Sequence, residues 1–294
     1  MLAVHFAPGA LFVTYAWTLT RAGAFSGRTR WHDALPATPA TAAAALLAIF
    51  ASAVLFGLLL HPFQVRAVRV LEGYWERWAP TSRLAGVLVE YQRRRWLVLF
   101  DATRRETPAT EGSAGKSLGE QIRERDAHSR LERDRHQAVR RLAALPPGNV
   151  LLPTALGNAL RAGELRAGER YGLATLPSWP RILPQVSDRL AAALSSARDS
   201  LDTAVNLCHC LLACTLLGAV ALHDEPRQWW LLAASLVGAA LAYKGAVTAA
   251  QAYAGLMYVV YDLHRLDLAK ALGHELPDHD GEWDLFRLIS DRLR

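Results

Sequence analysis

The sequence predicts an all-α integral membrane protein with three or four transmembrane helices and a helical region in water. The prediction rests on long runs of apolar residues. The runs 40–60 and 203–222 contain no charged residue, and each has about the 20 residues that a helix needs to cross a roughly 30 Å hydrocarbon layer. A third run, 228–261, contains one charge, Lys244. It is longer than a bilayer requires, so part of it should leave the membrane.

The stretch 2–19 is a weaker candidate for a fourth span. It contains His5 and a Pro8-Gly9 pair, so crossing the bilayer and dipping into its interface are equally good interpretations. A cleaved signal peptide is the competing interpretation, but no Lys or Arg precedes Pro8 and no clear small-residue cleavage site follows. We therefore expect Met1 to be retained.

The distribution of charge predicts the orientation. Residues 61–202 carry 23 Lys or Arg against 16 Asp or Glu, whereas residues 262–294 carry 5 against 8. Three of the basic residues follow the first span closely: Arg66, Arg69 and Arg77. Because positive charge near span ends marks the cytoplasmic side, the middle of the chain is assigned to the cytoplasm and residues 223–227 to an external turn. The arginines at 21, 28 and 30 oppose this orientation.

These patterns divide the chain into four regions. Within the second region we expect an interfacial helix at 63–78 and a flexible linker at 107–115, because the linker is rich in small and turn-forming residues. The regions are an N-terminal membrane region 1–62 (span 40–60, with 2–19 as the weaker span), a basic helical cytoplasmic region 63–202, a transmembrane hairpin 203–261 and acidic cytoplasmic C-terminal helices 262–294.

The segment 63–78 has apolar residues at helical spacing and basic residues between them. Such a helix should lie along the headgroups, with its arginines toward anionic lipid and its indole rings at the interface. Packing of the same helix on a cytoplasmic neighbour is the alternative. The residues expected to contact lipid are Arg66, Arg69, Trp75 and Trp78.

Further helices are predicted at 84–100 and 117–145, the second highly charged with a thin apolar stripe. Pro177, Pro180 and Pro184 predict an extended loop before the helix that leads into the hairpin. The C-terminal region is expected to form two short helices broken at Pro277.

Polar residues within the hairpin predict an intramembrane cluster. Asn206 and His209 share one face of the first helix. If the turn centres near residue 225, residues whose numbers sum to about 450 lie level, which places Asn206 level with Lys244 and Asp202 one turn away. The expected cluster of Asp202, Asn206, His209 and Lys244 is either a structural clasp or part of an ion path.

Small residues recur every four positions in the hairpin. Ala234, Gly238, Ala242 and Ala246 begin this series, and Ala44, Ala48 and Ser52 repeat the spacing in the first span. Small residues at this spacing mark close helix packing in lipid. The sequence leaves open whether the packing is within one chain or between copies.

Catalytic, metal and cofactor sites are not predicted. The segment 110–117, TEGSAGKS, lacks the first glycine and the preceding strand of a phosphate-binding loop. Cys208 and Cys210 point to nearly opposite helix faces, so with Cys214 they offer at most two sulfurs to one ion. The C-terminal histidines, such as His264, lack the spacing of a metal motif. No nucleic-acid partner is expected.

PTALGN at 153–158 and DLHRLDLAKAL at 262–272 carry a resemblance. With these segments the second half of the chain resembles a group of bacterial integral membrane proteins of unassigned function. The resemblance implies a bacterial plasma-membrane protein, and it transfers no catalytic residue. The excess of arginine, 30 residues against 3 lysines, also suggests a GC-rich bacterial genome.

Three functions remain as hypotheses. The first is a homo-oligomeric ion channel or pore-forming effector that is gated by its cytoplasmic region. The second is a non-catalytic scaffold, anchored in the membrane, that recruits a cytoplasmic protein through the charged helix 117–145. An interfacial enzyme acting on lipid is third, because no nucleophile with its base can be named.

Overall fold

The computed structural model describes the chain except for residues 1, 28, 76–78, 105–116, 277–280 and 294. Within the described residues every regular element is a helix, which confirms the all-α prediction. Five short 3-10 turns, η1 to η5, join the longer elements. The α-helices are α1 (Leu2–Arg21), α2 (Pro39–Leu60), α3 (Gln64–Glu72), α4 (Ala79–Arg104), α5 (Leu118–Ala143), α6 (Ala155–Arg166), α7 (Thr175–Ile182), α8 (Asp188–Ala221), α9 (Trp229–Ala271) and α10 (Glu282–Leu293).

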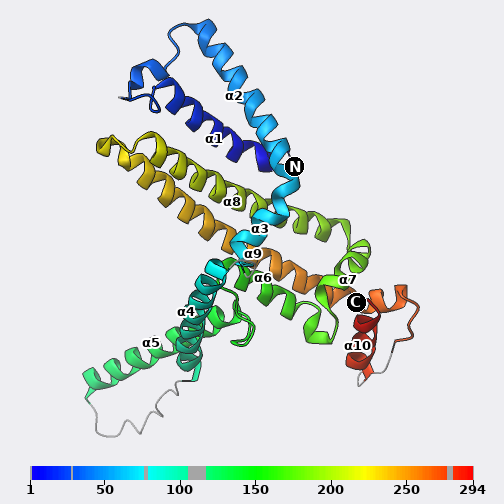
Figure 1. Ribbon diagram of the computed structural model, residues 1–294. Helices are drawn as coiled ribbons and strands as arrows, with labels where there is room; N and C mark the ends of the chain where they lie inside the picture. Colours follow the sequence, from blue (N-terminus) through cyan, green and yellow to red (C-terminus); the bar gives the residue numbers. More distant parts are fainter. Residues whose placement is uncertain (1, 28, 76–78, 105–116, 277–280, 294) are drawn as a thin grey trace.

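The α8–α9 hairpin forms the axis of the fold (Figure 1). The two helices run antiparallel over 34 and 43 residues. Thr215 Oγ1 lies 2.8 Å from Ser235 Oγ, and a Cβ at Gly218 would lie 3.4 Å from Leu232. The residue numbers of each pair sum to 450, so the predicted register of the hairpin is confirmed.

The N-terminal stretch forms one continuous helix, α1, which includes Pro8. It runs beside α8, and its Leu19 is buried against Ala221 and Leu222. Beyond α1, the Thr29 amide donates a 2.5 Å hydrogen bond to Glu225. The α1–α2 connection and the α8–α9 turn therefore lie at the same end of the bundle, which we call the turn end.

Helix α2 is mostly exposed, with only Ala53 and Gly57 buried. It crosses α1 where a Cβ at Gly9 would lie 3.3 Å from the Ala53 carbonyl oxygen. A 3-10 turn, η2, links α2 to α3. Val68 and Leu71 of α3 then pack on α6 and α8, so α3 is held against protein.

The PTALGN segment forms the junction between α3 and α6. Thr154 begins α6: its Oγ1 accepts a 3.0 Å hydrogen bond from the Gly157 amide and donates a 2.8 Å bond to the Glu72 carbonyl at the end of α3. A side chain at Gly157 would overlap that same carbonyl. The Asn158 amide group bonds to the backbone of Leu152 at both N and O, at 2.7 and 3.0 Å. Capping of α6 and docking of α3 therefore depend on one segment.

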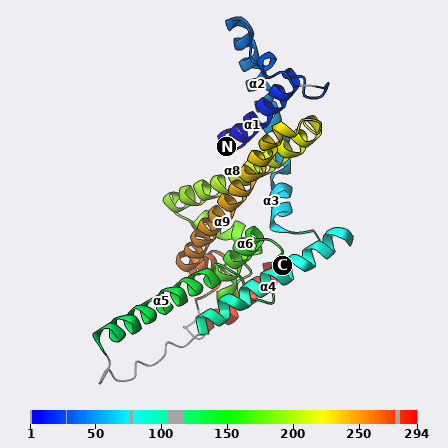
Figure 2. The ribbon, with the colours of Figure 1, turned by 90° about the vertical axis from the view of Figure 1, so that its left-hand side faces the viewer.

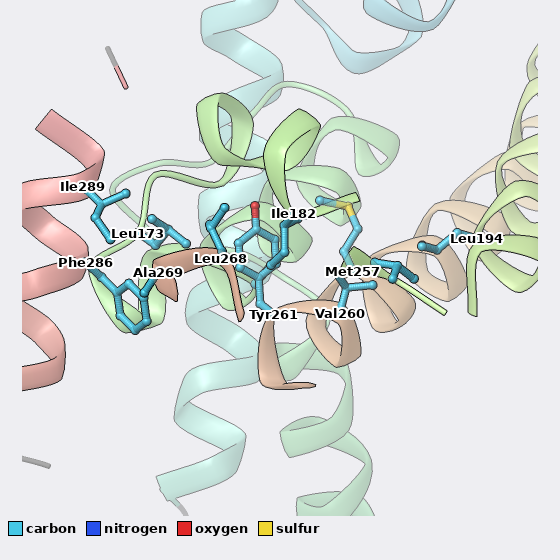
Figure 3. Packing of buried hydrophobic residues seen from close by; sticks show 12 residues of the cluster. Leu173, Ile182, Leu194, Met257, Val260, Tyr261, Leu268, Ala269, Phe286 and Ile289 are labelled. Carbon is cyan, nitrogen blue, oxygen red and sulfur yellow. The ribbon is translucent and has the colours of Figure 1, made fainter. Parts of the chain in front are cut away.

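The largest hydrophobic cluster lies at the end of the bundle opposite the turn (Figure 1), and Figure 3 shows its packing. We call it the base cluster. It joins the lower parts of α8 and α9 to α7, α10 and the loops between them. Tyr261 is fully buried in it and donates a 2.9 Å hydrogen bond to the Thr175 carbonyl. Its members are Ala167, Leu173, Ile182, Val186, Leu194, Met257, Val260, Tyr261, Leu268, Ala269, Phe286 and Ile289.

Two expectations for this end of the chain are wrong. Residues 175–182 form the short helix α7 where an extended loop was predicted. Pro177 lies in its first turn, where an amide has no helical partner to lose, and burial of Ile182 offsets the bond lost at Pro180. The stretch 262–271 continues α9 instead of forming its own helix, because no glycine or proline interrupts it before Gly273.

Helices α4 and α5 pair as an arm that extends from the rest of the molecule (Figures 1 and 2). On α4, Trp96 stacks on Phe100 with ring centroids 4.8 Å apart. The Trp96 ring also covers Gly148, in the segment that leads from α5 to α6. Ser117 and Glu120 form a reciprocal capping box that begins α5. We call α4 and α5 together the arm.

Candidate functional site

The polar residues of α8 lie on one side of the helix, as their spacing predicts. Asn206 is buried, and His209 is half-buried with Nδ1 2.9 Å from the Val205 carbonyl. Asp202 is paired with Arg198 at 3.9 Å, one turn earlier on the same helix. The acidic residue of the expected cluster is thus neutralised from its own helix.

Lys244 does not join this cluster. It is exposed, and in the described part of the chain it makes no ion pair with Asp202. Ala246 is fully buried in the hairpin, and Lys244, two residues earlier, leaves the helix about 200° around the axis. The position of Lys244 along the hairpin axis agrees with the predicted register, but its side chain points away from α8.

The predicted seam of small residues is only partly at the hairpin interface. Ala242 and Ala246 are buried there, and Gly238 approaches Leu211 at 3.3 Å, counted from a Cβ built on the glycine. Ala234 is exposed, because a strict four-residue repeat drifts by about 40° per step around the helix. The inward positions near the turn belong to two other small residues, Ser235 and Ala239.

The residues expected to contact headgroups have mixed positions. Arg66 and Arg69 are exposed. The Trp75 indole donates a 2.7 Å hydrogen bond to the Val70 carbonyl, and Trp78 lies outside the described residues. Because Val68 and Leu71 pack on protein, the structure favours the alternative in which this helix lies on a neighbour. The linker 107–115 also lies outside the described residues.

The cysteines and histidines form no metal site in the described residues. Cys208, Cys210 and Cys214 are free and buried. His264 Nδ1 lies 3.2 Å from Asp267 Oδ2, as a pair without a third ligand. TEGSAGKS lies outside the described residues except for Ser117.

A charged and aromatic network that was not predicted lies beside the base cluster. Asp262 accepts hydrogen bonds from Arg170 and from the Tyr171 hydroxyl. The guanidinium of Arg265 lies 4.3 Å from the Tyr171 ring centroid and donates a 2.6 Å bond to Glu282 on α10. Burial, together with the bond to Asp262, raises the pKa of Tyr171 and keeps its proton in place. This network fastens the end of α9 to α10 and to the loop after α6.

A second ionic group lies on α6 nearby. Arg161 bonds Glu164 at 2.9 Å and Glu169 at 3.1 Å. Burial raises the pKa of the Glu164 carboxyl above its ordinary value, although the Arg161 guanidinium opposes the shift. One arginine therefore pairs with both carboxylates.

The arm carries an apolar ridge that faces away from the molecule. Leu84, Val87, Tyr91 and Val98 of α4 are all exposed, Val87 at 68% and Val98 at 69%. Their spacing places them on one side of α4, with Arg94 at the edge. The opposite side, including buried Ala85 and Gln92, faces the molecule. We call these four exposed residues the α4 ridge. The helix was predicted at 84–100, but this apolar stripe was not, although its helical spacing is present in the sequence.

The described helices define an all-α protein with three helices that are long and apolar enough to cross a membrane, namely Pro39–Glu72, Asp188–Ala221 and Pro226–Ala271. Comparison of the chain with protein-family models, curated proteins and solved structures found no match.

Proposed function

We propose that the protein is a docking protein of the bacterial plasma membrane, whose arm binds a protein in the cytoplasm. This is the scaffold hypothesis, and the α4 ridge is the observation that carries it. Four large apolar side chains on one helix face are costly to leave in water, and contiguous apolar patches mark interaction sites. The ridge lies on an arm that extends from the bundle (Figure 2), where a partner can reach it.

The orientation follows from charge. The arm and the base cluster lie toward the end of the bundle opposite the turn end. The segment 61–202, which includes the arm, carries the surplus of basic residues. The positive-inside bias assigns that end to the cytoplasm. Exposed Arg66 and Arg69 follow α2 at the same side and are available to anionic headgroups.

The chemistry of the partner follows from the arm. Helices α4 and α5 carry twelve arginines against seven acidic residues. The partner that fits is an acidic amphipathic helix. Its apolar residues would pack on the α4 ridge, and its carboxylates would pair with the arginines at the edge of the ridge. A second copy of this chain fits poorly, because Arg94 would meet the same basic surface.

A photo-crosslinking experiment tests the docking function. A benzoylphenylalanine at position 87, on the ridge, should give a discrete crosslink to an acidic protein in intact cells. The same probe at Leu97, exposed on another side of α4, should not. Val98→Asp should reduce crosslinking from position 87 at least tenfold, because it places a carboxylate in the apolar contact. Crosslinks to lipid alone, to a second copy alone, or equally from both positions contradict the proposal.

A homo-oligomeric ion channel is the second candidate, and the direction of Lys244 favours it. A lysine on the outer face of an apolar helix must snorkel to the headgroups or face a polar surface such as a water-filled path between subunits. The unpartnered Ala44, Ala48 and Ser52 on exposed α2 offer a second surface for close packing between copies.

Conductance in planar bilayers separates the two candidates. A ring of Lys244 side chains predicts an anion-preferring current, and Lys244→Ala should lower that preference. Lys270→Ala, at the far end of α9, is the control and should leave it unchanged. A monomeric mass in detergent together with silent bilayers would remove the channel.

A further inference from the structure

A cavity of about 610 Å³ lies where the last turns of α5 meet α6 and α9. Alanine and glycine residues of these helices form much of its lining. Larger polar groups reach it from α5, from α6 and the loop after it, and from α9. We call it the arginine pocket, after the polar residues that line it: Arg140, Arg166, Arg170, Gln251 and Tyr258.

The charge of this pocket is one-sided. It has three arginines and no acidic residue in its lining. Within the described part of the chain, Arg140 and Arg166 make no ion pair. Glu164 of α6 and Glu169 of η3 already bind Arg161. Two guanidiniums directed to one cavity repel each other unless an anion lies between them.

Arg170 differs from the other two because it is fixed in position. Asp262 binds it, and its guanidinium lies 4.4 Å from the Tyr171 ring centroid and 4.1 Å from that of Tyr258. An arginine held by a carboxylate and two rings has lost most of its conformational freedom before any ligand binds. Its charge is already paired with Asp262, so it provides fixed N–H donors at low entropic cost.

The small residues that line the pocket account for its volume. Gly163 must be glycine, because a Cβ there would lie 2.5 Å from the Ala254 Cβ on α9. This contact brings α6 close to α9 and leaves no large side chain to fill the space below the arginines. A volume of about 610 Å³ exceeds what a bare phosphate fills and lies in the range of small organic ligands.

The depth of the pocket admits two sources of ligand. A span of about 20 residues that begins at Gln228 ends near Val247. Gln251 and Tyr258 lie four and eleven positions beyond Val247, or about 6 and 16 Å along the helix. A headgroup layer is about 5 to 7 Å thick on each side. If the membrane placement proposed above is correct, the pocket begins at headgroup depth and continues into water.

We propose that the arginine pocket binds a phosphate ester, with Arg140 and Arg166 as the primary ligands of the phosphate and Gln251 beside them. Arginine binds phosphate through paired N–H groups and stays charged at any physiological pH. The ester is either an anionic glycerophospholipid headgroup or a soluble organic phosphate. Because Arg140 belongs to the arm and Arg166 to the bundle, the bound phosphate ties the arm to the bundle.

Two binding measurements on the full chain test this proposal. The first is titration calorimetry with glycerol 3-phosphate in uncharged detergent micelles. The second is native mass spectrometry of protein from nanodiscs with equal parts of phosphatidylglycerol and phosphatidylcholine. Binding in the first assigns a soluble ester, and selective retention of phosphatidylglycerol in the second assigns a headgroup. The absence of both overturns the proposal.

Matched variants locate the binding. Arg140→Gln and Arg166→Gln should each weaken the binding that is observed about tenfold or more, because each removes a charged hydrogen-bond donor. Arg135→Gln, on α5 but outside the pocket, should leave it within about twofold at matched ionic strength. Both pocket arginines are exposed, so the variants should melt like the native chain. Equal losses in all three variants, or none in the pocket variants, would overturn the proposal.

Discussion

Gly157→Ala is expected to lower the melting temperature of the protein sharply. A Cβ at this position would overlap the Glu72 carbonyl and lie 3.0 Å from Leu152. The carbonyl cannot turn aside, because it accepts the hydrogen bond from Thr154 that joins α3 to α6. Overpacking typically costs about 1–3 kcal/mol. The clash here is with a backbone carbonyl, so we expect a cost at the upper end of that range. The corresponding fall is roughly 6 to 12 °C, measurable by tryptophan fluorescence in detergent micelles.

Gly86→Ala is the matched control for this prediction. Gly86 lies within α4, where an added Cβ meets no atom within 4 Å. There the substitution should stabilise the helix by about 0.5–1 kcal/mol, since alanine loses less backbone freedom. If the melting temperature of Gly157→Ala equals or exceeds that of the native chain, α3 is not docked on α6 through this contact.

The sequence was sufficient to predict those features that follow from the rise of single helices and from the position of the turn that joins two of them. Uncharged runs located the apolar helices, and simple counting from the turn gave the hairpin register that Thr215 and Ser235 show. Both follow from the fixed rise of a helix. Lys244 was placed at the correct level for the same reason.

Features that depend on several helices were not predictable in this way. The direction of Lys244 depends on which side of α9 meets α8, and α6 also competes for that surface through Gly163 and Ala254. Packing of Val68 on α6 required the position of PTALGN relative to α3, residues separated by about 80 positions in the chain. Amphipathic spacing alone is the same for a helix on lipid and a helix on protein.

The α4 ridge shows the same limit at the candidate site. Its apolar spacing was present in the sequence, yet the sequence also offered Ala85 and Trp96 on the other side as an apolar face. Only contact with the segment around Gly148 decides which side is covered. The α4 ridge is the side that is left exposed, and its proposed function follows from that exposure.

Phe286→Ala is expected to release α10 from the base cluster. Phe286 is fully buried there (Figure 3), and truncation of a buried phenylalanine costs about 3–5 kcal/mol. The attachments that remain include buried Ile289 and two hydrogen bonds of Ser290 Oγ, from the Ala174 amide at 2.7 Å and to the Gly172 carbonyl at 2.9 Å. Glu282 also stays paired with Arg265, and Leu285 and Leu293 stay packed against the base cluster. Because a 12-residue helix is marginal alone, α10 should detach as a unit before the bundle unfolds. Its amides should then exchange hydrogen at least about 100-fold faster.

The comparison with Leu288→Ala separates docking from helix propensity. Leu288 lies on the same helix but is exposed, so its truncation should change stability by no more than about 0.5 kcal/mol. Hydrogen exchange in α8 should stay slow in both variants, because the α8–α9 hairpin is packed along its length independently of α10. Fast exchange of α8 together with α10 in Phe286→Ala would mean that the base cluster and the hairpin unfold as one unit. Full protection of α10 in that variant would mean that its polar attachments suffice to hold it.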